Sequence, residues 1–273
     1  MKAKSKANAI DFGKSMIVLS SMVKRNVKNQ YRNSWLGVIW TVLNPLLNMI
    51  VMAMVFSKLL GGRAAVGDYP VYILAGNTVF NFMRMATVNA LHSIVINQDL
   101  LTKTRIKQYV FPVSNVFSAL VNFFFSFIAL IIVMVIRILM HAPVSFHWTM
   151  LMTIVPFLPS LILFVMGISL VLSVFYVYFR DIKHIYEVFL TLWMYATPLF
   201  YSLDVLKIDN PTINFIMHLN PMYHYVTYFR DITMFGNIPS LQEHLIIYAW
   251  GISMFLIGAL IFHFNKKKLL LRI

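Results

Sequence analysis

The chain has 273 residues, of which 60% are hydrophobic and only 12% are charged, and its mean hydropathy is +0.75. Soluble domains carry about 25% charged residues, so this composition excludes both a water-soluble domain and a disordered chain. The formal net charge is +14, which in a polytopic membrane protein indicates basic cytoplasmic loops and gives no reason to expect nucleic-acid binding. The sequence has no cysteine, which excludes disulfides, cysteine metal sites and thiol catalysis.

The residues before the first long apolar stretch predict an amphipathic helix at the membrane surface. Over residues 12–32, apolar side chains share one helical face, and Arg25, Lys28 and Arg32 lie on the opposite one. This pattern is typical of a helix lying in the cytoplasmic interface. We therefore expect residues 1–32 to form a basic cytoplasmic arm. It serves either as a simple anchor or as an anchor whose three cations contact a lipid headgroup or a partner subunit.

Six apolar stretches follow, each near the roughly 20 residues that a helix needs to cross a bilayer. They span residues 36–57, 70–91, 110–136, 149–176, 184–202 and 244–264. The predicted fold class is an all-α membrane protein whose six-span domain occupies residues 33–273. Lys and Arg concentrate before the first stretch, after the second, fourth and sixth, and are fewer elsewhere. The positive-inside rule then places both termini in the cytoplasm.

Polar side chains interrupt the first two expected spans. They are Trp40, Asn44 and Asn48 in the first span, and Asn77, Asn81 and Arg84 in the second. Polar groups in hydrocarbon are costly unless they bond to another helix or face water, so each set predicts either interhelical contacts or the lining of a pathway. Arg84 is the strongest candidate, because its planar donors suit a phosphate. The alternatives for Arg84 are snorkelling to the interface or an internal partner.

An aromatic stripe marks one face of the fifth expected span. It consists of Tyr186, Phe189, Trp193 and Phe200. Such a stripe is more often packing than a binding surface, although flat aromatic faces also suit sugar rings. We retain these four residues as candidates for a substrate path.

The loop over residues 97–108 predicts a short cytoplasmic helix that docks on a soluble partner. It mixes exposed charge with apolar side chains, and its candidate docking residues are Asp99, Leu100, Leu101, Lys103, Arg105 and Lys107. A basic loop that merely obeys the charge rule is the alternative.

Two further connections carry weaker signals. Arg180 and Asp181, in the turn between the fourth and fifth spans, are expected to cap helix ends or form an ion pair. The long connection over residues 203–243 is apolar enough to predict short re-entrant helices at the outer side, which must be surrounded by protein or water.

The sequence lacks the motifs of the common catalytic and metal sites. Glycines at positions 62 and 67 have the spacing of a phosphate-binding loop, but Asp68 and Tyr69 follow where Lys and Ser or Thr are required. We therefore predict a transport protein that is not itself an enzyme, with no catalytic residue, metal ion or cofactor of its own. The nine carboxylates are expected at the two sides of the membrane, with Asp11, Asp99, Asp181 and Glu187 on the cytoplasmic one, so they mark no route for protons or sodium, which disfavours ion-coupled transport.

Several segments, taken in order, resemble one family of membrane proteins. They read YRNSWLGVIW at 31–40, LNPL at 43–46, YFRDIKH at 178–184, TPLFY at 197–201 and NPMY at 220–223. They are similar to the permease subunits of ABC exporters for lipid-linked polysaccharides, which include teichoic acid, O-antigen and capsule exporters. The likeness extends over nearly the whole chain.

This resemblance implies a flippase-like exporter in a bacterial cytoplasmic membrane, acting on a glycan attached to an isoprenoid diphosphate. It implies a homodimer bound to two separate ABC ATPase subunits, which would hold the ATP and magnesium. Residues 97–108 would be the coupling helix, and Arg180 and Asp181 would belong to a gate near the lipid headgroup. The first and fifth spans would form the lateral opening.

Three other functions stay open at this point. A related ABC exporter of a smaller drug or lipid would suit the abundant Met and Phe residues. A membrane glycosyl- or acyltransferase would need a positioned acid, base or metal cluster, and none is visible. A passive channel would conduct without any partner.

Overall fold

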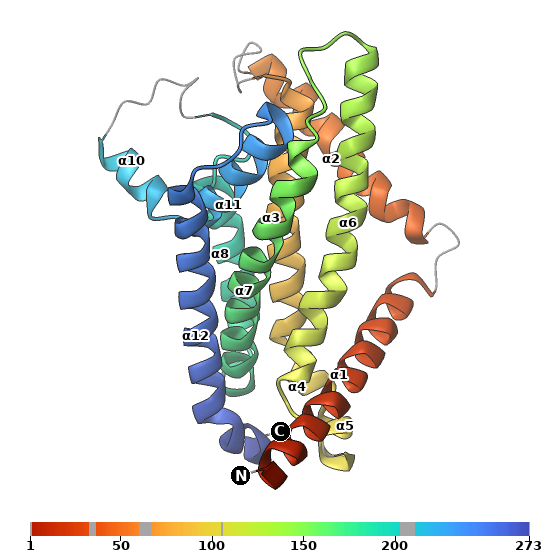
Figure 1. Cartoon of the computed structure of the whole chain (residues 1–273), viewed down its shortest axis with the longest axis vertical. Helices are drawn as coiled ribbons and strands as arrows, with labels where there is room; N and C mark the ends of the chain where they lie inside the picture. Colours follow the sequence, from red (N-terminus) through yellow and green to blue (C-terminus); the bar gives the residue numbers. More distant parts are fainter. Residues whose placement is uncertain (1, 33–36, 60–66, 105, 203–210, 273) are drawn as a thin grey trace.

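The computed structural model describes residues 2–32, 37–59, 67–104, 106–202 and 211–272, and within these ranges every regular element is a helix (Figure 1). The helices are α1 (Lys2–Tyr31), α2 (Gly37–Leu59), α3 (Tyr69–Leu91), α4 (Ser93–Ile96), α5 (Gln98–Lys103), α6 (Val110–Leu139), α7 (Thr149–Tyr178), α8 (Ile182–Ala196), α10 (Pro211–His218), α11 (Pro221–Arg230), the π-helix η1 (Asp231–Phe235) and α12 (Leu241–Arg272). The all-α prediction is confirmed for these residues.

Three segments in the described part are long and apolar enough to cross a membrane, namely Val110–Leu139, Met152–Tyr178 and Leu241–Leu269. They coincide with the third, fourth and sixth expected spans. Helices α2, α3 and α8 occupy the positions of the other three, and the count of six spans stays a prediction.

Helices α7 and α12 pack closely because glycines face each other at their contact. A Cβ atom on Gly167 would lie 2.3 Å from the backbone oxygen of Met254, and one on Gly258 would lie 2.3 Å from the backbone oxygen of Gly167. Small residues allow this approach and are typical of helix contacts inside membranes. Any larger side chain here would force the two helices apart.

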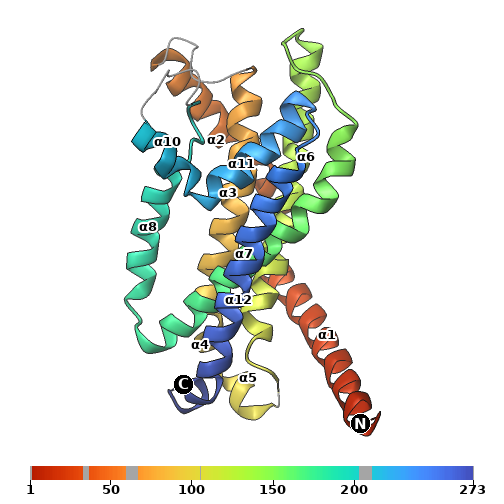
Figure 2. The same cartoon turned by 60° about the vertical axis from the view of Figure 1, so that its left-hand side comes forward.

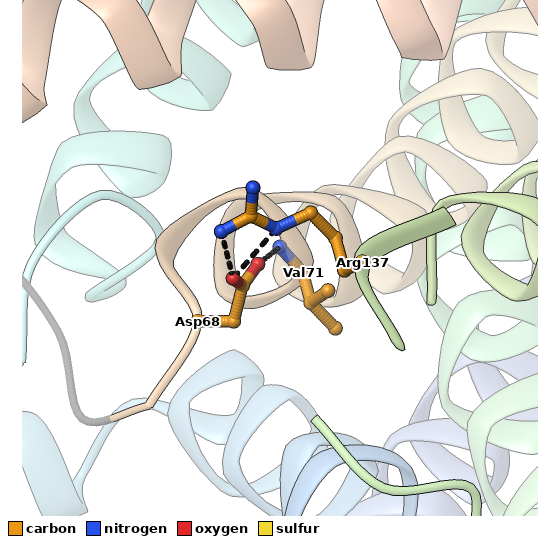
Figure 3. Close-up of polar contacts among 3 residues, drawn as sticks. All are labelled: Asp68, Val71 and Arg137. Atoms are coloured by element: carbon orange, nitrogen blue, oxygen red, sulfur yellow. Dashed lines mark hydrogen bonds and ion pairs between the residues drawn. The ribbon is translucent and has the colours of Figure 1, made fainter. Parts of the chain in front are cut away.

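Helix α3 begins at a buried carboxylate. Asp68 is the N-cap residue, and its Oδ1 atom accepts a hydrogen bond of 3.3 Å from the backbone N–H of Val71 (Figure 3). The guanidinium of Arg137, near the end of α6, donates to Asp68 Oδ2 through Nε at 2.8 Å and pairs with it through Nη2 at 2.6 Å. Asp68 thus stabilises the start of α3 and ties it to the end of α6.

Helix α8 is shorter than the expected fifth span. We predicted an apolar segment over residues 184–202, whereas the helix ends at Ala196 and Thr197 adopts an extended conformation. The cause is Pro198, because a proline disfavours helical geometry in the residue before it and cannot donate to the helix. Residues 197–202 therefore expose backbone carbonyls that need other partners.

Arg230 supplies several of those partners. It is 4% exposed, donates to the carbonyl oxygens of Pro198 at 2.7 Å and Leu199 at 2.9 Å, and stacks 3.5 Å from the ring centroid of Tyr72. The Tyr72 hydroxyl donates to the carbonyl oxygen of Tyr201 at 2.9 Å. We call this group, together with the Tyr69 hydroxyl that donates to the carbonyl oxygen of Phe200 at 2.8 Å, the Arg230 cradle. Non-helical backbone at membrane depth requires such internal satisfaction.

The cradle also explains a glycine in α3. A Cβ atom on Gly76 would lie 2.5 Å from Arg230 Nη2, so the guanidinium occupies space that any other residue would fill. Asn220 joins α8 to the start of α11 near the same cradle. Its amide accepts from Trp193 Nε1 at 2.7 Å and from the backbone N–H of Met222 at 3.0 Å.

The two ends of the molecule differ in the elements that they carry. The N-terminus, the C-terminus and α5 lie at one end, and α10 and α11 lie toward the other (Figure 1). Figure 2 shows α1 leaving the bundle obliquely and α8 rising toward α10 and α11. The end that carries both termini therefore also carries the predicted coupling segment.

Helix α1 is held to the rest of the molecule by polar side chains. Asn26 donates to Asn115 at 3.4 Å, Gln30 donates to Asn122 at 3.1 Å, and Arg25 donates to Asn97 at 2.7 Å. Met22 is buried beside these contacts. The predicted amphipathic helix of residues 12–32 lies within α1, and its position at the membrane surface stays a prediction.

Candidate functional site

A polar cavity of about 660 Å³ lies where α2, α3, α6 and α8 meet the C-terminal end of α1. Its lining consists of Gln30, Thr41, Asn44, Asn48, Asn81, Arg84, Met85, Val88, Asn89, Asn122, Ser126, Glu187, Leu190 and Thr191. We call it the polar cavity. Most of these side chains donate or accept hydrogen bonds, although the helices that supply them are predominantly apolar.

Arg84 and four amides of the polar cavity have no protein partner. The side chains of Arg84, Asn44, Asn48, Asn81 and Asn89 make no hydrogen bond or ion pair with any residue that the structure describes. Among lipid-embedded helices, polar groups left open in this way face water or a ligand. The cavity therefore offers one guanidinium and several amides to a polar molecule.

The structure brings together four of the six polar residues selected from the first two expected spans. Asn44, Asn48, Asn81 and Arg84 line the polar cavity. Trp40, which is 42% exposed, and Asn77, one helical turn from Asn81, do not contribute to its lining. Four of the selected residues therefore share one cavity, and their contact with a substrate stays a prediction.

Sequence reasoning missed several members of the lining. They are Gln30, Asn89, Asn122 and Glu187. Two signals were available. Ser114, Ser118, Asn122 and Ser126 recur every fourth position in an apolar span, and Glu187 is the one carboxylate inside residues 184–202. Gln30 gave no comparable signal, because it belongs to an amphipathic helix with many polar residues.

Three members of the predicted aromatic stripe lie on α8 and form a row of ring contacts, and Phe200 lies beyond the end of the helix. Phe189 stacks 6.2 Å from Tyr186 and lies 5.2 Å from Trp193, measured between ring centroids. Tyr186 is buried and donates to Thr87 at 2.8 Å, and Phe200 is buried as well. The indole N–H of Trp193 donates a hydrogen bond to the Asn220 side chain. Phe189, 48% exposed, is the member of the stripe that is most open to a ligand.

The predicted coupling segment contains a short helix, α5, which is shorter than the range 97–108. Asp99, Lys103 and Lys107 are exposed and Leu100 is half-buried, whereas Leu101 is 6% exposed and packs into the apolar core at this end. Arg105 lies outside the described residues. The exposed face available to a partner is therefore the charged one.

The turn before α8 differs from expectation. The Asp181 side chain makes no capping hydrogen bond to α8, and Arg180 lies 5.3 Å above the ring of Tyr176 instead of pairing with Asp181. The guanidinium gains more from the aromatic face than from an exposed carboxylate, whose pairing is weak in water. Both residues are exposed, as are Lys28 on α1 and Arg32 just after its end.

A helical bundle that holds a polar cavity, with both termini at one end, is typical of transport proteins of the membrane. The chain belongs to the ABC-2 type transporter family, whose model matches residues 18–234. This match covers the polar cavity, the α5 segment and the Arg230 cradle.

Curated relatives extend the likeness along the whole chain. An O-antigen export system permease protein RfbA from Myxococcus xanthus is 28% identical over 92% of this chain and 93% of its own length. Two proteins of the same name from Klebsiella pneumoniae are 26% and 24% identical over 92% of both chains. The resemblance predicted from short motifs is thereby confirmed.

Proposed function

We propose that this chain is the membrane subunit of an ATP-driven exporter of a lipid-linked polysaccharide. The names of its relatives favour the O-antigen class over teichoic acid and capsule. Transport would run from the cytoplasmic to the outer face of a bacterial inner membrane, with both termini in the cytoplasm.

One observation carries this proposal, namely the unpartnered polar groups of the polar cavity. Amide side chains both donate and accept, as sugar hydroxyls require, and Arg84 has the planar donors that suit a phosphate. A carrier diphosphate brings negative charge beside a lipid tail. The tail would stay in lipid while the diphosphate and glycan contact Arg84 and the amides.

In this proposal, the ATP hydrolysis that drives transport takes place in a separate subunit. Members of an ABC permease family work with an ABC ATPase, which would bind the ATP and magnesium. Two copies of the chain and two ATPase subunits would form the transporter. Closure of the ATPases around ATP would move the α5 segments and change the opening between the two copies, in which α2 and α8 would form the lateral gate.

Exposed basic residues at the C-terminal end of α1 and in the turn before α8 fit the early steps. Lys28, Arg32 and Arg180 are exposed and would attract anionic headgroups from the inner leaflet. Phe189 would then provide a flat face along which a sugar ring can pass.

The proposal is tested by co-purifying the chain with candidate ATPase subunits and measuring ATP hydrolysis in lipid. We expect a complex of two permease and two ATPase subunits. Exchanging the charges of α5 with Asp99→Lys and Lys103→Glu keeps the net charge and the buried Leu101, and should abolish stimulated hydrolysis. The matched exchange Asp181→Lys and Lys183→Asp, in the turn before α8, should leave ATPase binding intact.

Failure of every candidate ATPase to bind a well-folded chain would contradict the proposal. Turnover of a lipid-linked sugar by the purified chain alone would instead identify a transferase, and ion conduction without a partner would identify a channel.

A further inference from the structure

A second hollow lies at the end of the molecule that carries the termini, away from the polar cavity. It is a groove of about 920 Å³ that is bounded by α1, α7, α12 and the segment between α5 and α6. The lining residues used below are Gln108, Phe255, Ala259, His263, Lys266 and Lys267. We call it the basal groove.

The basal groove changes from apolar to basic along its length. On α12, Phe255, Ala259 and Phe262 are followed toward the C-terminus by His263, Lys266 and Lys267. In α6 and the residues just before it, the change from apolar to basic runs toward the N-terminus. Val113 and Val110 line the apolar part, and Gln108 and Lys107 follow them toward the basic part. Because α6 and α12 run in opposite directions here, the apolar parts coincide and the basic parts coincide.

Gln108 is a buried polar side chain without a partner. It is 8% exposed, and neither its amide nitrogen nor its amide oxygen makes a hydrogen bond with any residue that the structure describes. A buried amide left unsatisfied is destabilising, and a bound molecule with donor or acceptor groups would relieve that cost. Gln108 lies at the boundary between the apolar and basic parts of the groove.

We propose that the basal groove binds one anionic phospholipid of the cytoplasmic leaflet. The acyl chains would lie against Phe255 and Ala259, the phosphate would face Lys266 and Lys267, and the Gln108 amide would bond to the phosphate or ester oxygens. Among the described lining residues the charged ones are basic, and they complement an anionic headgroup.

The location gives this lipid a mechanical role. Ser15, Met16 and Leu19 of α1 form one wall of the groove, and Thr104 and Ile106, which follow α5, form another. A lipid between them would join the membrane-surface helix to the predicted coupling segment. This inference does not depend on the exported substrate, because none of its residues lines the polar cavity.

The test is to count lipids retained by the purified full chain with native mass spectrometry after incubation with phosphatidylglycerol. We expect one retained lipid per chain and at least tenfold less phosphatidylcholine. The double variant Lys266→Ala and Lys267→Ala should lower phosphatidylglycerol retention about tenfold or more. The matched pair Lys103→Ala and Lys268→Ala removes the same charge from exposed residues outside the groove and should stay within twofold.

A steric variant tests the apolar part independently. Ala259→Trp fills the groove beside Phe255 and should prevent retention while the melting temperature stays near that of the wild type. If Ala259→Trp lowers the melting temperature, the comparison of lipid retention between the two lysine double variants tests the proposal. Equal loss in both lysine pairs, equal retention of phosphatidylcholine, or displacement of phosphatidylglycerol by an equimolar isoprenyl phosphate would overturn the proposal.

Discussion

Arg84 and Arg230 are both arginines among apolar helices, and their surroundings differ in every respect. Arg230 is 4% exposed, and carbonyl oxygens and an aromatic ring occupy its donors and its face. Arg84 is exposed in a cavity and has no partner among the described residues. A guanidinium satisfied by its own chain holds the fold together, and one left open is available to a ligand.

The largest effect is expected where the satisfied arginine is removed. Arg230→Ala would leave the Leu199 carbonyl without its donor, leave the Pro198 carbonyl with only the 3.4 Å bond from the Tyr72 hydroxyl, and open a hole against Tyr72. We expect a loss of about 3 kcal/mol or more in stability, seen as a lower melting temperature and a low yield of folded protein. Arg230→Lys should restore only part of the lost stability, because an ammonium group lacks the planar guanidinium donors that bond both carbonyl oxygens. A fully stable Arg230→Ala protein would show that the cradle is dispensable.

Asn220 tests the other half of the same region. Asn220→Ala removes the bonds to Trp193 Nε1 and to the N–H of Met222, which also caps α11. A loss of about 2 kcal/mol is expected in thermal unfolding. The exposed Asn237 offers a matched control, and Asn237→Ala should change stability by less than about 0.5 kcal/mol. Equal effects of the two variants would contradict the role of Asn220.

The polar cavity should respond in the opposite way, through transport instead of stability. Asn81→Ala removes an unpartnered amide of the lining, and Asn77→Ala removes one a turn away that does not line the cavity. We expect roughly fivefold slower export for Asn81→Ala, corresponding to about 1 kcal/mol for one hydrogen bond, and near-normal export for Asn77→Ala. Both proteins should melt like the wild type. The reverse order of export rates would remove Asn81 from the site.

The smallest effect concerns Asp231, next to the cradle. Burial, reinforced by Glu243 and opposed by Arg230, raises the pKa of its carboxyl from 3.8 to about 6. The folded state therefore holds a proton that the unfolded chain releases, so stability should fall as the pH rises from about 4 to about 6 and then level off. The melting temperature should drop over this window, and Asp231→Asn should abolish that slope. An unchanged slope in the variant would assign it to other groups.

The sequence predicted most of the helices and four residues of the polar cavity for one physical reason. Apolar length and polar interruptions are local properties, so α3, α6, α7 and α12 begin and end within a few residues of expectation in most cases, and Asn81 and Arg84 stood out. Even the early end of α8 was encoded locally by Pro198, although the prediction did not use it.

The cradle could not be predicted in the same way. Local sequence does not single out Arg230, because its partners lie 31, 32 and 158 positions away in the chain. Nor does a sequence reveal that Gly76 leaves the space for a guanidinium. Hydrogen bonds between residues far apart in the sequence depend on the packed structure. A count of charges along the sequence therefore does not distinguish a buried arginine from one in an exposed loop.

The central claim is that Arg84 is left open for the transported molecule. The most direct test measures ATP-dependent export of a lipid-linked glycan by proteoliposomes that contain the chain and its ATPase, comparing wild type, Arg84→Gln and the charge-matched Arg272→Gln outside the cavity. Arg84→Gln should export at least about tenfold more slowly with an unchanged melting temperature, as expected for the loss of a charge-assisted hydrogen bond, and Arg272→Gln should export normally. Wild-type export by a well-folded Arg84→Gln protein would contradict the claim.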